Sequence, residues 1–274
     1  MSSNVVTSRT NARVKQLRAA FAGHARLSGG LVAIEGEHLL REALRSGVVF
    51  KAVFISERLD LPRWMPFGVE VLRLANDVFR SVVETQSPQG LAALIVPPVR
   101  ELSAVMDGFD AATLVAPAAP LILIACGLQD PGNLGTLVRS AEAFRATGVL
   151  TATTHPGTVS AWNQKALRAS AGSIFRVPVV GATLDEVAGL RVRGIRLLAA
   201  VGAQAHGAVE AQEMDLVRPC ALLIGNEGSG LGTEWMEIAD AQVTIPCPGM
   251  VESLNAAVAG SLLLYEASRQ RTSQ

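Results

Sequence analysis

Short apolar runs alternate with segments of helical periodicity through the second half of this 274-residue chain. Six runs have the length and composition of strands, at residues 121–126, 149–152, 176–180, 195–201, 220–224 and 242–245. Helices are predicted between and after them, at residues 134–146, 161–169, 184–190, 233–238 and 253–268. Such apolar strands alternating with helices indicate an α/β fold with a parallel sheet covered on both faces.

The first hundred residues have a different order of elements. Helices are predicted at 11–22, 36–46 and 76–83, and strands at 31–34, 49–55, 69–72 and 91–96. This order indicates a small α/β domain. Prolines then bracket an Ala-rich stretch that is typical of a linker, with one short helix at 101–106. We therefore expect a first domain at residues 1–97, a linker at 98–119 and a second domain at 120–274.

Several protein classes are disfavoured. The apolar runs are far shorter than the roughly 20 residues that cross a bilayer, and the N-terminus has no apolar core of a signal peptide, so we expect a cytoplasmic protein. Cys126, Cys220 and Cys247 lie far apart in or beside apolar runs, which favours reduced thiols. No metal site is expected, because the histidines show no ligand spacing: His24, His38, His155 and His206.

Charge is distributed unevenly, although the net charge is zero. Residues 1–100 hold 13 of the 24 Lys and Arg but only 8 of the 24 Asp and Glu. Basic side chains gather near the N-terminus, at Arg9, Arg13, Lys15, Arg18 and Arg26. Such an arm can follow the phosphates of a nucleic acid, where each contact releases counterions. The alternative interpretation is an ordinary solvated helix face.

Ligands of parallel sheets bind beyond the carboxyl ends of the strands, here in the loops after residues 126, 201, 224 and 245. The first loop reads GLQDPGNLGTLVR. Its glycines and proline predict a tight turn, and Asn133 is expected to cap the helix that follows. Arg139 lies about two turns into that helix, where it either reaches back to a phosphate or is an ordinary surface arginine.

The loop after residue 224 reads IGNEGSGL. Gly225, Gly228 and Gly230 allow a sharp turn and a close approach of a ligand to the backbone. The loop is neither a GxGxxG dinucleotide fingerprint nor a phosphate-binding P-loop. Glu227 would repel phosphates and suits a ligand with a ribose or a positive charge. S-adenosylmethionine has both.

The last loop and helix read TIPCPGMVESLNAAVA. Ser253 is placed to cap a helix that begins at about Leu254, and small residues in that helix favour close packing on another helix or a partner subunit. Asn255 is either a capping accessory or a side chain directed into the pocket that the turn creates. One face of the helix is apolar, with Leu254, Val258, Leu262 and Tyr265.

Together these segments resemble the SpoU, or TrmH, branch of RNA 2′-O-ribose methyltransferases in the SPOUT superfamily. The resemblance rests on DPGNLGTLVRSAEAF, LLIGNEGSGL and IPCPGMVESLNAAVAGSLLLYE, in that order, and covers about residues 121–270. Residues 14–96, with VAIEGEHLLREALRSGVVFKAVFIS and QGLAALI, look like the substrate-binding domain often fused in front, which is similar to a ribosomal-protein type of RNA-binding fold.

The resemblance implies a trefoil knot in the C-terminal segment and a homodimer formed through the last helix. It implies that S-adenosylmethionine is held by the knotted loops, here by Gly225, Asn226, Gly228, Ile245, Cys247 and Leu254. Cys247 departs from the family pattern, in which many members have Met at that position. It also implies that Arg139 positions the target phosphate, while other polar residues orient the reacting groups: Asn133, Glu227, Ser253 and Asn255.

The leading hypothesis is therefore a 2′-O-methyltransferase acting on ribosomal RNA, with 23S ribosomal RNA as the favoured substrate. The sequence does not decide whether it confers resistance to an antibiotic. The alternatives are a transfer RNA methyltransferase, a non-catalytic RNA-binding or ribosome-assembly protein of the same fold, and a nucleotide-dependent enzyme of Rossmann type. The missing GxGxxG disfavours the last of these.

Overall fold

The computed structural model describes residues 5–24, 29–85, 87–107, 119–154, 157–251 and 253–273. Arg26, His155 and residues 108–118 of the predicted linker lie outside these ranges. The chain forms two compact units. The first contains Met1–Val99 together with Trp162–Phe175, and the second contains Arg100–Ala161 and Arg176–Gln274.

The first unit is built on a four-stranded sheet with the order β1-β4-β2-β3. Only the pair β2 and β3 is parallel; β4 pairs antiparallel with both β1 and β2. The elements are α1 (Ala12–Phe21), β1 (Val32–Glu35), α3 (Glu37–Arg45), β2 (Phe50–Ser56), β3 (Glu70–Leu74), α4 (Asn76–Arg80), β4 (Leu91–Ile95), α7 (Gln164–Ser170) and the 3-10 helix η1 (Ser173–Phe175).

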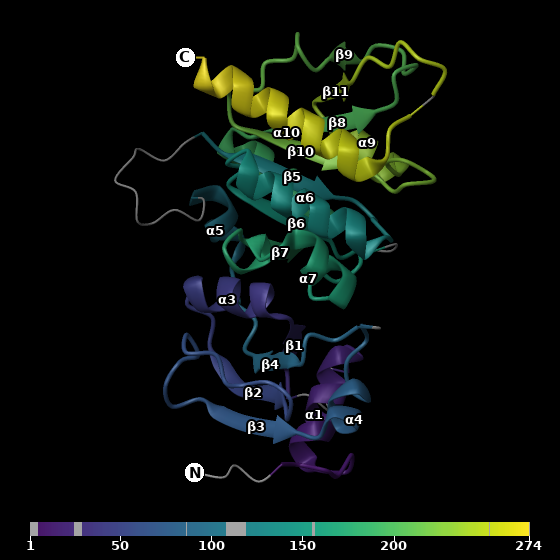
Figure 1. The fold of residues 1–274 in the computed structure, drawn as a ribbon. Coiled ribbons are helices and arrows are strands. Elements are labelled where there is room, and N and C mark those ends of the chain that lie inside the picture. The colour runs from purple at the N-terminus through teal and green to yellow at the C-terminus, as the bar shows by residue number, and fades with distance from the viewer. Residues whose placement is uncertain are drawn as a thin grey trace. The chain divides into compact units, whose positions relative to one another are not determined.

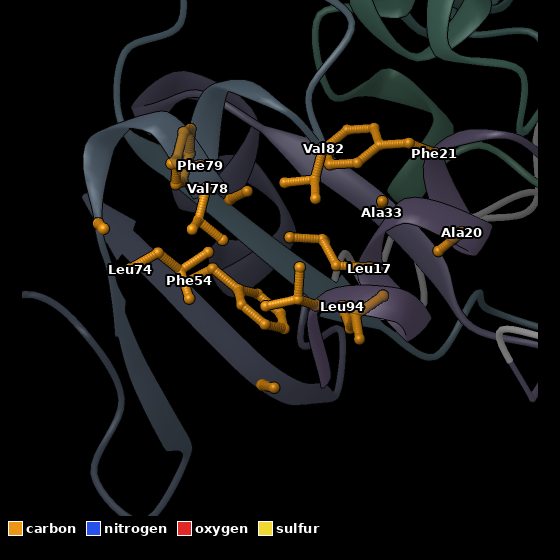
Figure 2. Close-up of a cluster of buried hydrophobic side chains, with 14 residues drawn as sticks. Leu17, Ala20, Phe21, Ala33, Phe54, Leu74, Val78, Phe79, Val82 and Leu94 are labelled. Atoms are coloured by element: carbon orange, nitrogen blue, oxygen red, sulfur yellow. The ribbon is translucent and has the colours of Figure 1, made fainter. Parts of the chain in front are cut away.

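Alternate residues of these strands supply a core between the sheet and helices α1 and α4. Figure 2 shows this core, where Leu17 of α1 and Phe79 of α4 approach the strand residues Phe54 and Leu94. Ile34, Val53, Ile55 and Ala93, which alternate with these core residues, are also buried, and α3 packs on β1 and β4. The N-terminal unit is therefore a sheet with helices on both faces.

The second unit contains a seven-stranded sheet with the order β7-β6-β5-β10-β8-β11-β9, in which every pairing is parallel. This confirms the predicted parallel sheet. The elements are α5 (Leu102–Asp107), β5 (Leu121–Ala125), α6 (Pro131–Ala143), β6 (Gly148–Ala152), β7 (Val179–Ala182), α8 (Leu184–Gly189), η2 (Leu190–Arg193), β8 (Arg196–Val201), β9 (Val209–Glu210), β10 (Cys220–Ile224), α9 (Thr233–Ile238), β11 (Ala241–Thr244) and α10 (Ala256–Thr272).

Helices cover both faces of this sheet (Figure 1). α6 and α10 lie side by side on one face, where the Ser140 and Ser261 hydroxyls are 2.7 Å apart. Gly260 permits this approach, because a Cβ at that position would stand 2.5 Å from Leu137 Cδ2. α5, α8 and α9 contribute to the core on the opposite face. Cys126 and Cys220 are free and buried, and this burial raises the pKa of both thiols.

Three predicted element boundaries were wrong for identifiable reasons. The strand predicted at 176–180 begins only at Val179. Residues 173–175 form η1 directly before the predicted start, and the Arg176 side chain pairs with Glu142. α6 begins at Pro131, so its cap is Asp130, whose carboxylate accepts from Gly132 N at 2.7 Å, and not Asn133. α10 likewise begins after Asn255, which replaces the predicted cap Ser253.

The sheet order places the site. β5, β10, β8 and β11 are consecutive neighbours and run in the same direction, so the loops after them emerge at one edge. These are the four loops that the sequence singled out. Since α6 and α10 begin beside the same edge, their first turns join these loops.

Candidate functional site

A cavity of about 300 Å³ opens at the carboxyl edge of β8, β10 and β11. Its lining combines apolar residues, among them Ile224, Val243 and Leu263, with residues of the loops that follow these strands. The predicted residues that line it are Gly225, Asn226, Glu227, Gly228, Ile245, Cys247, Ser253 and Leu254. Three sets of loops distant in the sequence therefore meet around one space.

The loop after β10 forms one wall because its two ends pair with each other. Asn226 N donates to Gly230 O at 2.9 Å, and Gly230 N donates to Asn226 O at 3.0 Å. The Asn226 side chain closes the turn by accepting from Gly228 N at 2.8 Å and by donating to Gly127 O at 2.9 Å. A Cβ on Gly225 would lie 2.3 Å from the Gly230 carbonyl carbon, so the wall requires glycine there.

Glu227 connects this wall to the loop after β5. Its carboxylate accepts from Asn133 Nδ2 at 2.9 Å and from the backbone N–H groups of Gln129 and Asp130, each at 3.3 Å. Partial burial raises the pKa of the Glu227 carboxyl, but the hydrogen bonds outweigh that effect, and the pKa lies below its ordinary value of 4.5. Glu227 is therefore an ionised acceptor at neutral pH.

Asn255 extends this network to α10. Its Nδ2 donates to Asn133 Oδ1 at 3.2 Å, while its Oδ1 caps the helix by accepting from Ala257 N at 2.9 Å and Val258 N at 3.2 Å. Glu227, Asn133 and Asn255 thus form one hydrogen-bonded chain that joins the loop after β10 to the first turn of α6 and the N-cap of α10. Asn255 is therefore the helix cap, and its second contact is with Asn133 and not with the cavity, whose lining does not include it.

Arg139 and Ser253 are not part of this hydrogen-bonded chain of side chains. The Arg139 side chain is exposed on α6, and none of the described residues forms an ion pair or hydrogen bond with its guanidinium. Its charge is therefore available to an anion. Ser253 is exposed at the cavity wall, where it is free of the capping role expected for it.

Sequence reasoning flagged the loop after β8 but selected no residue in it. Ala200, Val201, Gly202 and Ala203 all line the cavity. The one available signal was their place at the end of a buried strand, because small apolar residues carry no chemical signature. Gln129, whose N–H donates to Glu227, was missed because a contact made by backbone does not depend on the residue type.

The four basic residues predicted to bind RNA divide into two pairs. Arg9 and Arg13 are ion-paired, at 3.4 Å from Asp77 and 2.6 Å from Glu70 respectively. Lys15 and Arg18 form no ion pair with any residue that the structure describes. They lie on α1 beside Ala12, Ala19 and Ala22, in a shallow groove.

The cavity suits S-adenosylmethionine on three counts. Its volume lies at the lower end of the roughly 300–1,000 Å³ that is typical of small-molecule sites. Its lining includes Gly225, Gly228 and Gly230, whose backbone N–H and C=O groups can bind an adenine and a ribose, together with apolar residues such as Ile224 and Leu263. The ionised Glu227 at its edge suits a cation better than a phosphate. Among the described residues no cluster of His, Cys, Asp and Glu could hold a metal ion.

Two family models match the chain. Residues 120–265 match the SpoU rRNA Methylase family, and residues 11–93 match the MRM3-like substrate binding domain. None of the described helices is long and apolar enough to span a membrane.

Relatives of similar length have assigned activities. The chain is 32% identical over 261 residues to the 23S rRNA (guanosine(2553)-2′-O)-methyltransferase RlmP of Bacillus subtilis, covering 95% of this chain and 97% of the relative. It is 31% identical over 282 residues to a 23S rRNA (uridine(2479)-2′-O)-methyltransferase of Streptomyces viridochromogenes, covering 98% and 93%.

Solved structures show the same fold. The SpoU methyltransferase AviRb from Streptomyces viridochromogenes, in complex with the cofactor AdoMet, superposes with a TM-score of 0.80 at 28% identity, covering 96% of this chain and 99% of that one. An AdoMet-bound rRNA methyltransferase from Sinorhizobium meliloti also gives a TM-score of 0.80, at 26% identity, covering 97% and 98%.

Proposed function

We propose, since the chain belongs to the SpoU rRNA methylase family, that it transfers a methyl group from S-adenosylmethionine to a ribose 2′-hydroxyl of 23S ribosomal RNA. The observation that carries the proposal is the hydrogen-bonded chain Glu227–Asn133–Asn255 at the edge of the cavity, with Arg139, which pairs with none of the described residues, farther along the same helix as Asn133. A protein that only binds RNA has no chemical need for this combination.

The chemistry explains why such an arrangement is useful. Bound S-adenosylmethionine supplies a methyl group on a positively charged sulfur. A ribose hydroxyl is a poor nucleophile, so its oxygen must be held in line with the methyl carbon and must lose its proton as the new bond forms. The protein therefore has to fix the ribose and to stabilise the developing charge.

Arg139 is proposed to fix the phosphate next to the target ribose. An arginine remains protonated at neutral pH, because its pKa is above about 12, so it suits an anion and is a poor base. Its exposed guanidinium offers two parallel N–H groups for the phosphate oxygens. Glu227, Asn133, Ser253 and Asn255 are proposed to orient the ribose and the loops around it.

The test separates cofactor binding from methyl transfer. Calorimetry should detect S-adenosylmethionine binding to the wild-type protein, and labelled methyl groups should appear on unmodified 23S ribosomal RNA. Arg139→Ala should lower transfer by more than about 100-fold and change cofactor affinity little, because Arg139 does not line the cavity. Arg193→Ala is a matched control, since Arg193 is an exposed arginine on η2. An equal loss of cofactor affinity and of methyl transfer in Arg139→Ala would contradict the assigned role.

Asn255→Ala tests the polar chain in the same assay. It should reduce turnover, because the variant lacks the bond to Asn133. Asn255→Ser preserves a capping side chain without that bond, and should keep the stability of α10 but not the turnover. Full activity in both variants would leave Asn255 as a helix cap only.

The N-terminal unit is proposed to select the RNA, with Lys15 and Arg18 as its phosphate contacts. Arg9 and Arg13 were included in the sequence prediction, but their pairing with carboxylates makes them weaker candidates. Ribosomal RNA is favoured over transfer RNA by the named activities of the relatives. Action in the cytoplasm stays part of this proposal.

A homodimer through α10 is also proposed. α10 buries one face on its own unit and leaves an apolar stripe exposed, with Val258 47%, Leu262 42% and Tyr265 52% accessible. A second copy of the chain is the proposed cover for this stripe. The trefoil knot implied by the resemblance likewise stays a prediction.

A further inference from the structure

Thr158 links the two sides of the turn that follows β5. Its hydroxyl donates to Ala125 O at 2.6 Å and accepts from Gly127 N at 3.0 Å. A hydroxyl is one of the few side-chain groups that can do both at once. Thr158 itself is held by backbone, since Thr158 N donates to Ala152 O at 2.8 Å and Val159 N donates to Leu128 O at 2.9 Å.

Gly127, whose N–H donates to the Thr158 hydroxyl, has a backbone conformation that residues with side chains rarely adopt. Gly127 has a φ of +75°, in the left-handed region that side chains disfavour. Its carbonyl oxygen accepts from Gln129 Nε2 at 3.0 Å and from Asn226 Nδ2 at 2.9 Å. The Gly127 residue is therefore fixed at its N–H by Thr158 and at its C=O by two amides.

The turn at Gly127 sets the position of the next two residues. The N–H groups of Gln129 and Asp130 donate to Glu227, whose carboxylate also accepts from Asn133. A shift of Gly127 would thus move the donors that align Glu227 with the rest of the polar chain. Thr158 is not one of the described residues that line the cavity.

We propose that Thr158 is a positioning residue for methyl transfer, whose hydroxyl fixes the Gly127 turn and through it the alignment of Glu227 and Asn133. The inference rests on the proposed function. It predicts an effect on turnover with little effect on cofactor affinity, because the hydroxyl acts on the loop that leads into α6, the helix of Asn133 and Arg139, and Thr158 does not line the cavity.

The experiment compares Thr158→Val, which keeps the shape and removes the hydroxyl, with Thr158→Ser, which keeps the hydroxyl. Thr147→Val is the control for general destabilisation. The Thr147 hydroxyl also donates to a carbonyl of β5, Leu121 O at 3.1 Å, but at the opposite end of the strand. All proteins are full length and are assayed with unmodified 23S ribosomal RNA and labelled S-adenosylmethionine.

Thr158→Val should lower kcat by about 10- to 100-fold, the range expected when a reacting group is misplaced by about 1 Å. The dissociation constant of S-adenosylmethionine, measured by calorimetry, should change less than about three-fold, because Thr158 does not line the cavity. Amide hydrogen exchange should accelerate in the peptide that contains residues 126–133. Thr158→Ser should restore kcat and protection.

Three results would overturn the proposal: wild-type kcat in Thr158→Val per folded molecule, no rescue by Thr158→Ser, or an equal fall of kcat in Thr147→Val. If the wild-type protein transfers no methyl group to 23S ribosomal RNA, the proposed function fails on its own account. The hydrogen-exchange comparison then still decides whether the Thr158 hydroxyl fixes the Gly127 turn.

Discussion

Gly225→Ala tests whether the wall of the cavity depends on the close pairing of its two ends. The added Cβ would lie 2.3 Å from Gly230 C, 2.4 Å from Leu231 N and 2.6 Å from Gly230 O. All three are backbone atoms, so no side chain can rotate away. The loop must open by about 1 Å before these contacts reach ordinary van der Waals distance.

Opening the loop removes the two backbone hydrogen bonds between Asn226 and Gly230. Each is worth about 0.5–1 kcal/mol, and residual crowding adds about 1–2 kcal/mol, so the closed wall is destabilised by about 2–4 kcal/mol. If S-adenosylmethionine requires the closed wall, its dissociation constant rises by about 30- to 700-fold. Gly249→Ala should change it little, because a Cβ there has no neighbour within 4 Å.

Calorimetry with S-adenosylmethionine measures both variants, and circular dichroism with thermal unfolding reports whether each is folded. A folded Gly225→Ala protein that binds the cofactor within about three-fold of wild type would refute the reasoning, because the closed wall would then not be needed. Equal losses in Gly225→Ala and Gly249→Ala would also refute it, since the effect would not follow from the contact distances.

Other predictions concern charge and assembly. Because the pKa of Glu227 is lowered in the folded protein, its ionised form should stabilise the fold at neutral pH; that contribution should fade as pH falls below 4.5, and denaturation curves of Glu227→Gln should lack it. Neutralising Lys15 and Arg18 together should reduce the salt slope of RNA binding by about 2, whereas Arg9→Gln should change it less. An unchanged salt slope would show that Lys15 and Arg18 do not contact RNA phosphates and that they belong to an ordinary solvated face of α1. Leu262→Glu should yield monomers by light scattering; a persistent dimer would exclude the α10 stripe as the interface.

The parallel sheet of the second unit could be predicted from the sequence, because its central strands are apolar on both faces. β5 and β10 lie in the middle of the sheet and are buried along their whole lengths. Such runs have no other stable placement than between two layers of helices. β9 was missed because two residues at a sheet edge, Val209 and Glu210, produce no pattern.

The residues that line the cavity could be predicted where they belong to a sequence motif. The hydrogen bonds among the residues of the site could not. Asn133 and Asn255 were both picked out, but nothing in the sequence shows that their side chains meet, since 122 positions separate them. Thr158 lay in no motif at all. A backbone contact such as Gln129 N to Glu227 depends on the path of the chain, which residue types do not encode individually.

The grouping of residues 162–175 with the N-terminal unit affects how such enzymes can be recombined. Within that unit Gln164 is buried and donates to Ala33 O at 2.9 Å, and the rings of Trp162 and Phe175 approach to 6.4 Å. A domain exchange cut only at the linker would leave this segment behind with the wrong partner. Chimeras that transfer residues 1–99 and 162–175 together should be the ones that fold, because each unit is built from two separate stretches of the chain.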